Sequence, residues 1–367
     1  MRRLPWLAAW STFVVVLTAS APPDAWNRAE PGFAYEFPRD HAIHHGFKTE
    51  WWYFTGNLFD AHGRRFGYEL TFFRQGLRPP NEQNPERSRF LVSDLKFAHF
   101  AVTDVNGRKF SYEQKTSRGA FGEAGFDEDR RIAWVEDWSL SFGPSGSFEL
   151  AATSADASIK LHLSPLGSPV IHGTDGVSQK SSNGEHASHY YSVPRLATTG
   201  ELRTAREEFA VHGESWFDHE WATNQLAAEQ IGWNWLSLQW QDGSALMLYE
   251  MRLAGGKIDP ASSGTLIRSD GSTQNLSSSS FEITPLRRWR SPRSGAIYPV
   301  EWKVKLLGEQ IEFTVRAALD DQELSLAPVA YWEGAVDAAG SAPGRSIKGR
   351  GYLELTGYAA PLRELGK

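Results

Sequence analysis

The chain has 367 residues, of which 41% are hydrophobic and 22% charged, and it contains 15 Trp and no Cys. The lack of Cys excludes a disulfide framework, a thiolate metal site and a Cys nucleophile. A formal net charge of -6 at pH 7 gives no electrostatic reason to expect a nucleic acid or an anionic membrane as a partner. At roughly 150 residues per domain, the length predicts about two domains of a soluble globular protein.

Residues 1–21 have the layout of a secretory signal peptide. Arg2 and Arg3 precede an apolar run that ends in the small residues Ser20 and Ala21. The apolar run is about 15 residues long, which is shorter than the roughly 20 residues that a membrane-spanning helix needs. We therefore expect cleavage near residue 21, followed by a periplasmic or secreted mature protein with no stable insertion in a membrane.

Alternation of apolar and polar residues with a period of two dominates the rest of the chain. Between residues 65 and 74 the large apolar side chains occupy every second position, as in a strand with one buried face. Turn signals such as Asn106-Gly107 and Asp242-Gly243 separate the runs, and the main helix candidate is 223–230. The pattern predicts an all-β fold of antiparallel sandwiches or up-and-down barrels with little helix. Further runs lie at 90–104, 132–142, 147–152, 158–163, 245–253, 297–307, 310–317 and 351–358.

A weak internal echo suggests duplication. Residues 50–74 contain an aromatic strand, a Gly turn and an apolar strand that ends in Arg, and residues 232–252 repeat that order. The simplest architecture is two similar β-barrels that join near residues 199–206. We place the first barrel at 22–203 and the second at 204–367.

The first candidate cluster lies between residues 40 and 53, where His and carboxylate residues adjoin three aromatic rings. One interpretation is a proton donor, Glu50 or His44, in a dry site lined by Trp51, Trp52 and Tyr53, where desolvation would raise a carboxyl pKa. The alternative is that the three rings are barrel core and that Glu50 caps a strand pair.

A metal interpretation of this cluster would use His41, His44 and Glu50 as ligands. Their spacing matches no zinc signature, and adjacent His44 and His45 would point to opposite faces of a strand. We therefore predict no metal. No P-loop or dinucleotide-binding Gly fingerprint is present either, so we expect no cofactor.

The second cluster is residues 213–221, GESWFDHEW. On a strand, Trp216, Asp218 and Glu220 share one face, with neighbours roughly 7 Å apart. Two close carboxylates repel each other when both are ionised, so one keeps its proton to higher pH and can act as a general acid. Asp218 and Glu220 are therefore our candidate acid and base. The alternative is an exposed acidic turn whose charges are solvated.

A third cluster, residues 186–195, contains Ser188 and Ser192 near His189. The chain has no Gly-x-Ser-x-Gly nucleophile elbow, which disfavours a serine hydrolase. Arg74 and Arg252 each end an apolar strand, and a buried Arg there would need a carboxylate partner such as Glu50 or Asp218 in a structural ion pair.

The Trp residues gather in short stretches that also contain acids and His, which indicates a pocket as well as core packing. The residues that we expect to bind a ligand are Trp51, Trp52, Tyr53, Arg74, Tyr191, Trp216, Trp221, Trp233 and Trp235.

The ordered series of motifs from about residue 37 to 358 resembles the carotenoid 1,2-hydratase and AttH-like family. The resemblance implies a pair of lipocalin-like β-barrels with a pocket near their junction, an architecture that agrees with the periodicity. The motifs are DHAIHHGFKTEWWYFTG at 40–56, FGYELTFFR at 66–74, WVEDWSL at 134–140, HYYSVPRL at 189–196, GESWFDHEW at 213–221, GWNWL at 232–236, YPVEW at 298–302, YWEG at 331–334 and GYLELTGY at 351–358.

The family's best-known activity, by the same resemblance, is hydration of an isolated C=C bond at the end of a carotenoid. Protonation gives a tertiary carbocation, which water attacks. That chemistry needs a strong general acid in a dry pocket and aromatic faces that stabilise the cation. Fungal relatives use similar double barrels to shape a polyene for cycloaddition, so the fold does not fix the reaction. The export signal departs from the carotenoid enzymes, whose substrates lie in the inner membrane.

Two classes of function follow. The first is an exported, cofactor-independent lyase or hydrolase that binds an apolar isoprenoid or lipid-like molecule between the barrels and acts by acid catalysis. The second is a non-catalytic periplasmic lipid carrier associated with an ABC-type transporter, as the resemblance to AttH-like proteins implies. Paired carboxylates can also cleave sugars, for which an open, wet groove is expected instead of a closed apolar pocket.

Overall fold

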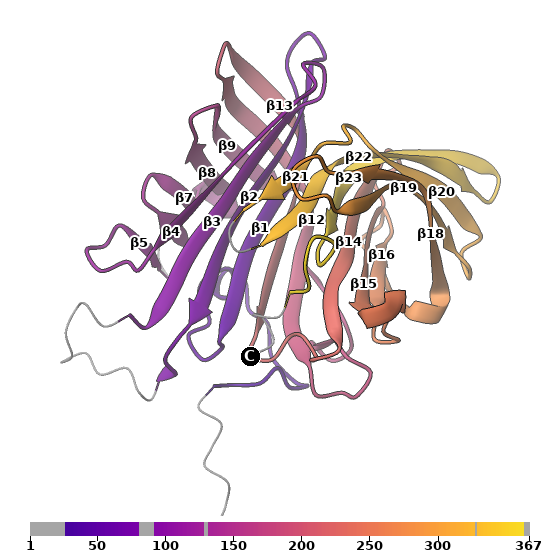
Figure 1. The fold of residues 1–367 in the computed structure, drawn as a ribbon, viewed down its shortest axis with the longest axis horizontal. Helices are drawn as coiled ribbons and strands as arrows, with labels where there is room; N and C mark the ends of the chain where they lie inside the picture. The colour runs from indigo at the N-terminus through magenta and orange to yellow at the C-terminus, as the bar shows by residue number, and fades with distance from the viewer. Residues whose placement is uncertain (1–25, 81–91, 128–130, 327–328, 363–367) are drawn as a thin grey trace, which may run out of the picture.

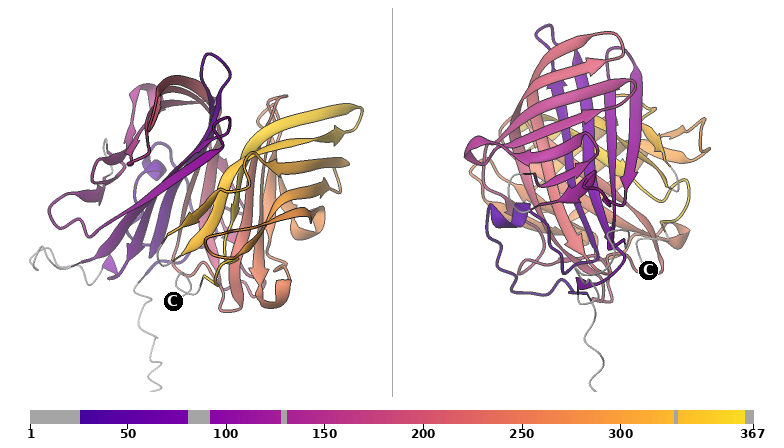
Figure 2. Two further views of the ribbon diagram at one scale, coloured as in Figure 1. Left: turned by 45° about the horizontal axis from the view of Figure 1, so that its top comes forward. Right: turned by 90° about the vertical axis from the view of Figure 1, so that its left-hand side faces the viewer.

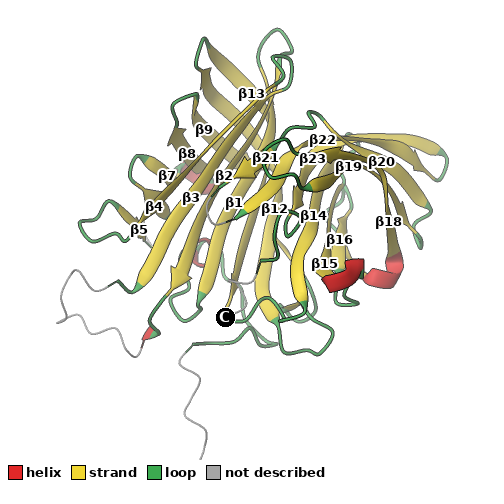
Figure 3. Cartoon of the chain, in the orientation of Figure 1, coloured by secondary structure: helices red, strands yellow, loops and turns green. Residues whose placement is uncertain are grey.

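The structure is a computed structural model that describes residues 26–80, 92–127, 131–326 and 329–362, so the signal peptide predicted at 1–21 lies outside the described residues. Nearly all regular structure in these ranges is β-strand (Figure 3), which confirms the all-β prediction. The described helices are single 3-10 turns of three residues, and none has the length and hydropathy needed to cross a membrane. These turns are η1 (Arg39–His41), η3 (Pro144–Gly146), η4 (Ala254–Gly256) and η5 (Ser278–Ser280).

The predicted helix at 223–230 is wrong. Residues 223–229 form an irregular loop of bends and turns that carries the chain from one sheet to the other, and Gln230 begins β14. The Gln230 side chain holds the end of this loop: it accepts a hydrogen bond from the backbone N–H of Ala227 at 2.9 Å and donates one to the carbonyl of Lys180 at 2.6 Å. These contacts fix an irregular backbone where local propensity alone favours a helix.

The first sheet has 13 antiparallel strands in the order β4-β3-β2-β1-β13-β12-β9-β8-β7-β6-β5, with β10 and β11 also paired to β12. It curls until β6 lies against β2, β3 and β4 across the interior. Its strands are β1 (Thr49–Phe59), β2 (Arg65–Gly76), β3 (Asp94–Asp104), β4 (Lys109–Ser117), β5 (Ala124–Phe126), β6 (Ala133–Val135), β7 (Trp138–Phe142), β8 (Phe148–Thr153), β9 (Ala157–Pro165), β10 (Val170–Ile171), β11 (Ser178–Gln179), β12 (Ala187–Thr204) and β13 (Glu208–Ala222).

The second sheet has 10 strands in the order β17-β16-β15-β14-β23-β22-β20-β19-β18, with β21 paired to β22. It curls in the same way beside the first sheet (Figures 1 and 2). Its strands are β14 (Gln230–Trp240), β15 (Ala245–Leu253), β16 (Ser263–Ile267), β17 (Thr273–Ser277), β18 (Phe281–Arg290), β19 (Ile297–Leu306), β20 (Ile311–Ala317), β21 (Glu323–Ser325), β22 (Ala330–Ala342) and β23 (Arg345–Leu355).

The two sheets repeat one strand order, which agrees with the similarity between residues 50–74 and 232–252 in the sequence. In the first sheet the opening hairpin β1–β2 is followed outward by β3 and β4, and β1 pairs with the late strand β13. In the second sheet the hairpin β14–β15 is followed by β16 and β17, and β14 pairs with the last strand, β23.

The chain passes from the first sheet to the second between Ala222 and Gln230. Residues 203 and 204, where we placed the boundary between the barrels, end β12, and the following β13 pairs with both β1 and β12. The 208–222 segment therefore belongs to the first sheet, because its hydrogen bonds join the opening hairpin to the later strands.

Three large apolar layers and one small cluster around Leu324 fill the described part of the fold. The interior of the first sheet, which we call the first-barrel interior, contains large buried side chains such as Trp52, Phe54 and Trp221. The second interior is built around Trp302 and Trp332. A third layer, between the two sheets, includes Tyr53, Trp216, Trp235, Tyr249 and Tyr352.

Polar contacts hold the two sheets together around this third layer. Arg65 on β2 makes an ion pair of 2.7 Å with Asp337 on β22, and the amide of Asn57 on β1 donates to the carbonyl of Gly351 on β23. Gly67 allows the close approach, since a Cβ there would lie 2.8 Å from both the Cβ of Ala335 and the hydroxyl of Tyr352. The sheets thus form one packed unit with a shared face.

We predict that Leu70→Ala lowers the free energy of unfolding by about 2–5 kcal/mol, because Leu70 is fully buried in the first-barrel interior and its loss leaves a cavity. The matched control Leu166→Ala, at a side chain that is 58% exposed, should change it by less than about 0.5 kcal/mol. Urea unfolding followed by Trp fluorescence measures both, and equal effects of the two substitutions would contradict the assigned core.

Candidate functional site

A cavity of about 910 Å³ lies between the two sheets, and we call it the inter-sheet cavity. Strands β1, β2 and β13 supply one wall, and β14, β15, β22 and β23 supply the other. Aromatic side chains dominate the walls, which include Trp51, Tyr53, Tyr190, Trp233, Trp235 and Tyr249.

Two rows of residues face each other across this space. Because paired residues of antiparallel strands point to the same face, the register places Tyr53, Asp218 and Ser192 in one row across the first sheet. The corresponding row across the second sheet is Tyr249, Trp235, Glu354 and Glu333. The Tyr53 hydroxyl donates a short hydrogen bond to Glu333 and so joins the two rows.

Asp218 is the best-organised carboxyl group in the cavity wall. Three groups donate to it: the Tyr190 hydroxyl at 2.5 Å, the Trp216 indole N–H at 2.6 Å, and the Ser192 hydroxyl. Burial raises its pKa, and although these hydrogen bonds oppose the shift, the pKa remains at about 7. Asp218 therefore exchanges its proton near neutral pH in a site shielded from bulk water.

A second set of carboxyl groups occupies the opposite wall. Burial raises the pKa of Glu354 to about 7, although the Trp233 indole N–H donates to it at 2.7 Å. Burial and the charges of Glu69 and Glu354 hold the pKa of Glu333 well above its usual range. Glu69, whose charge acts on Glu333, is on β2 of the first sheet; it is also buried, and its Oε2 has no hydrogen-bond partner among the described residues. The cavity thus contains several acids that favour the protonated form.

Glu220, the neighbour of Asp218 on the same face of β13, has a cationic partner. The Lys180 ammonium lies 2.9 Å from its Oε1, and the Gln225 amide N–H donates to the same oxygen at 3.3 Å. The two carboxyl groups that we chose as acid and base therefore share a face, as expected, but they differ in environment: Asp218 has neutral donors and Glu220 has a cation.

The structure places Glu50 and His44 away from Asp218 and Glu220. Glu50, Trp52, His219 and Trp221 point into the first-barrel interior, whereas Trp51, Tyr53, Asp218 and Glu220 face the inter-sheet cavity. Side chains alternate between the two faces of a strand, so adjacent residues in one motif separate into two sites. The same alternation places Tyr191 in the first-barrel interior and Tyr190 in the cavity.

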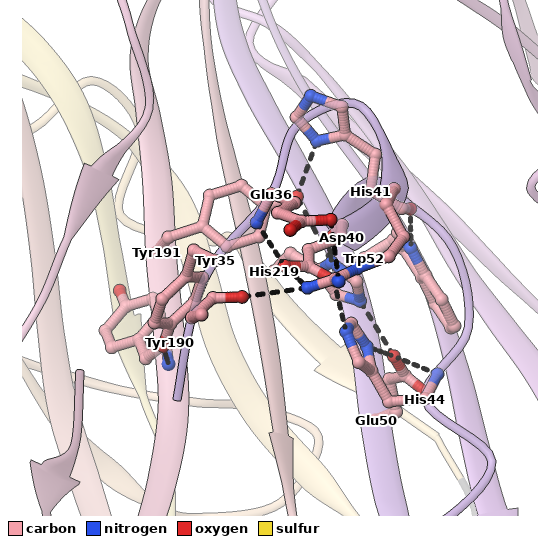
Figure 4. Close-up of polar contacts among 12 residues, drawn as sticks. Tyr35, Glu36, Asp40, His41, His44, Glu50, Trp52, Tyr190, Tyr191 and His219 are labelled. Carbon is pink, nitrogen blue, oxygen red and sulfur yellow. Dashed lines mark hydrogen bonds and ion pairs between the residues drawn. The ribbon is translucent and has the colours of Figure 1, made fainter. Parts of the chain in front are cut away.

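Glu50 is the centre of a buried hydrogen-bond network (Figure 4). Its Oε1 lies 2.7 Å from His44 Nδ1 and 3.0 Å from His219 Nε2, and the His44 backbone N–H donates to both of its oxygens at 3.0 Å. Burial would raise the pKa of Glu50, but the charge of His44 and the hydrogen bonds from both His residues lower it to about 2. Glu50 is therefore ionised at neutral pH and cannot serve there as a proton donor.

His44, Glu50 and His219 are also the described residues with the geometry closest to a metal site. One ligand atom from each lies within 4.8 Å of the others. The set differs from the one that we considered from the sequence, because His41 instead hydrogen-bonds to the Tyr191 hydroxyl at 2.6 Å. The three groups satisfy one another through hydrogen bonds, and the ring of His44 stacks on Trp221 with centroids 3.7 Å apart.

Arg74 and Arg252 have different environments. The Arg74 guanidinium donates hydrogen bonds to Asp94 at 3.0 Å and to the carbonyl of Phe47 at 2.7 Å. It also forms an ion pair of 3.8 Å with Glu50, so Arg74 is a buried structural cation beside the Glu50 network. Arg252 lies over the Tyr358 ring at 3.5 Å. Arg74 contributes to the rim of the inter-sheet cavity as well.

The third cluster has a different pairing from the expected one. Ser192 contacts His172 Nε2 at 2.6 Å as well as Asp218, while His189 interacts with the carbonyl of Gly176. Ser188 Oγ is buried with no partner among the described residues. Ser192 therefore orients Asp218 and is linked to a neutral His172, whose pKa burial lowers to about 3.

Sequence reasoning missed Tyr190, Lys180, Glu333 and Glu354. Glu333 and Glu354 lie inside YWEG and GYLELTGY, which we quoted only for the resemblance. The available signal was an aromatic residue nearby: Trp332 adjoins Glu333, and Tyr352 lies two residues before Glu354. Tyr190 adjoins the residue that we chose, Tyr191. Lys180 is an isolated cation in a polar loop, and only the fold brings it to Glu220.

Together the fold and the site define a double-sheet β-protein with an aromatic, carboxyl-rich cavity between its sheets. The family model described as AttH-like matches residues 28–358, and the chain belongs to the AttH-like family. This confirms the resemblance found in the sequence. No curated protein matches the chain.

Solved structures with this fold include an AttH protein from Nitrosomonas europaea, which is 33% identical, has a TM-score of 0.81, and aligns over 90% of this chain and 99% of its own. Kievitone hydratase from Nectria haematococca is 15% identical with a TM-score of 0.68, over 91% of this chain and 97% of its own. CghA with Sch210972 is 12% identical with a TM-score of 0.52, and it aligns over 89% of this chain and 95% of its own.

We predict that Glu50→Gln lowers the free energy of unfolding at pH 7 by about 3 kcal/mol. The folded pKa of about 2 lies below the ordinary value of 4.5, so ionised Glu50 stabilises the fold above pH 4.5, and this contribution is lost as the pH falls towards 2. The wild type and Glu50→Gln should therefore differ less in their free energy of unfolding at pH 3 than at pH 7.

Urea unfolding at the two pH values measures this difference. The matched control is Glu149→Gln, which breaks a Glu–His pair of 2.6 Å whose carboxylate is 47% exposed, and it should change the free energy of unfolding by less than about 1 kcal/mol. A Glu50→Gln protein as stable as the wild type at pH 7 would show that the network does not support the fold.

Proposed function

We propose that the protein is an exported, cofactor-independent hydratase that adds water to a C=C bond of an apolar isoprenoid or lipid-like molecule held in the inter-sheet cavity. The observation that carries the proposal is Asp218, a buried carboxyl group in the wall of an aromatic cavity with a pKa of about 7. A general acid is most effective when its pKa lies near the working pH. The hydratase among the proteins of similar fold supports the same reaction class.

Asp218 is the proton donor in this reaction. Protonation of one alkene carbon leaves a carbocation on the other, and the electron-rich faces of Trp51 and Trp235 stabilise that cation. The Tyr190 hydroxyl, which accepts a hydrogen bond from the Trp235 indole N–H at 2.9 Å, together with Trp216 and Ser192, stabilises the carboxylate that remains. These donors hold the carboxyl group in one orientation, so it does not reorganise during the transfer.

Glu354 is the base that completes the addition. It lies in the opposite row, and the charge of Asp218 is one of the causes that raise its pKa to about 7. Ionised Glu354 accepts a proton from the attacking water while a new C–O bond forms at the carbocation. The proton on Glu354 then returns to Asp218 through solvent, so the net reaction is alkene plus water to alcohol.

The second candidate is a non-catalytic periplasmic lipid carrier that works with an ABC-type transporter. The aromatic walls favour it, since they would hold an apolar molecule whether or not Asp218 reacts with it. The two candidates differ in one observable: a carrier releases its ligand unchanged, whereas a hydratase releases it with one added water.

The decisive experiment incubates the purified protein with an apolar lipid extract of its own host in ¹⁸O-water and analyses the products by mass spectrometry. We expect products that carry one ¹⁸O hydroxyl. Asp218→Asn should reduce their rate of formation by about 10²–10⁴-fold, the usual contribution of a general acid, while still binding the ligand. The matched control is Asp156→Asn, an exposed carboxylate on the hairpin between β8 and β9, which should leave the rate unchanged.

Recovery of an unmodified ligand by both the wild type and Asp218→Asn would overturn the hydratase and support the carrier. Cleavage of an added oligosaccharide would overturn both lipid functions.

The pH dependence follows from the two carboxyl groups. Asp218 must be protonated and Glu354 ionised, and each has a pKa of about 7, so kcat/KM should peak near pH 7 and fall on both sides. Glu220, Tyr190 and Lys180 also surround Asp218. In Glu354→Gln the decrease below pH 7 should disappear while the decrease above pH 7 remains. A wild-type profile that is flat from pH 6 to 8 would contradict these roles.

A further inference from the structure

The inter-sheet cavity extends from Asp218 across the outer face of the first sheet as far as β4. The register of the strands divides this face into rows that run at right angles to the strands. One row, which we call the back row, consists of Asp218, Tyr53, Thr71, His99 and Gln114. All five residues line the cavity. The cavity therefore spans five neighbouring strands, of which β1 to β4 lie side by side in Figure 1.

A second row, two residues further along each strand, gives this face an apolar surface. It consists of Glu220, Trp51, Phe73, Phe97 and Thr116, and all of them line the cavity. The rings of Phe73 and Phe97 are stacked with their centroids 4.7 Å apart. Trp51, Phe73 and Phe97, which we call the aromatic row, are each partly exposed, so a ligand in the cavity can contact their rings.

Two hydrogen bonds to β22 close the cavity behind the aromatic row. The Tyr53 hydroxyl donates to Glu333, and the Tyr331 hydroxyl lies 2.7 Å from His99 Nδ1. Tyr53 and His99 belong to the back row, so these contacts join the back row to the second sheet. A ligand cannot pass between the sheets at these two points. The space that remains runs along the aromatic row, across the strands.

The two ends of this channel differ in exposure. At β13 the channel ends at Asp218, which is only 3% exposed, and beside it the Trp235 indole N–H donates to the Tyr190 hydroxyl at 2.9 Å. At the other end the lining is open to solvent, because Thr116 on β4 is exposed and Leu77, which follows β2, is 52% exposed. A chain that enters at the open end thus reaches Asp218 along an apolar path.

We propose that the ligand is an extended hydrocarbon chain that lies along the aromatic row, with one end at Asp218 and the other at the exposed end of the channel near β4. Four strand intervals of about 4.8 Å separate β13 from β4, which gives a path of about 19 Å. With C–C bonds of about 1.5 Å at tetrahedral angles, an extended chain advances roughly 1.25 Å per carbon, so about 15 carbons fill the path.

This inference rests on the proposed function and narrows its substrate class from any apolar molecule to a chain long enough to cover Phe97. Phe73 and Phe97 lie two and three strands away from β13, so they contact carbons remote from the bond that Asp218 protonates. Binding energy from such remote contacts can be used to position the reacting bond. A compact molecule of the same carbon number would leave Phe97 uncovered and lose this energy.

The test compares three isoprenoid alcohols that differ only in length: geraniol with 10 carbons, farnesol with 15 and geranylgeraniol with 20. Binding is followed by the change in Trp emission, since Trp51, Trp233 and Trp235 line the cavity. We expect farnesol to bind about 10- to 100-fold more tightly than geraniol, because five further carbons leave water. Geranylgeraniol should gain less than about threefold over farnesol, because its additional carbons extend beyond β4 into solvent.

Phe97→Ala removes the ring at the far part of the row. Farnesol should then bind about tenfold more weakly, whereas geraniol, which is too short to cover Phe97, should bind as it does to the wild type. The matched control is Phe209→Ala, at another partly buried Phe of the first sheet that packs on Phe66 outside the cavity, and it should change neither affinity. If Phe97→Ala does not fold, the length dependence of the wild type decides by itself.

Affinities that are equal for the three alcohols, or that rise as steeply from 15 to 20 carbons as from 10 to 15, would overturn the proposal. Loss of geraniol binding in Phe97→Ala to the same extent as farnesol binding would do so as well, and so would binding of none of the three. The outcome is separable from that of the hydratase proposal. The expected length dependence without any ¹⁸O incorporation overturns only hydration, and hydration without it overturns only the extended channel.

Discussion

The antiparallel pairing of β1 with β13 is the constraint on which the rest of the structure depends. One face of this pair carries Glu50 and His219 into the first-barrel interior, and the other carries Tyr53 and Asp218 into the inter-sheet cavity. The pair therefore forms the wall between a structural network and a candidate active site. Any shift of register by one residue would exchange the two sets of side chains.

Burial has opposite consequences for the acids on the two sides of this wall. Glu50 has His44 and His219 beside it, and their charge and hydrogen bonds keep it ionised although it is fully buried. Asp218 has only neutral donors in direct contact, so burial dominates and its pKa rises to about 7. The difference between a structural carboxylate and the proposed proton donor is thus a difference in the charge of the nearest partners.

Much of the fold and part of the site could be predicted from residue patterns. The period of two specified the strands, and it correctly grouped Asp218 with Glu220 and Trp216 on one face. The same rule, applied within HYYSVPRL, offered no means to choose between Tyr190 and Tyr191, because both neighbours are aromatic and both are buried. Only the pairing of Tyr190 with Glu220 decides that Tyr190 faces the cavity.

The sequence by itself determined the all-β class, the two related halves, the family and the acidic, Trp-rich segments from which the cavity is built. The tertiary structure alone decided which acids meet. Glu333 and Glu354 reach the cavity with Asp218 because two sheets pack face to face, and Lys180 reaches Glu220 through a loop. The physical reason is that alternation and propensity act over neighbouring residues, whereas burial, and with it each pKa, depends on what the opposite sheet places nearby.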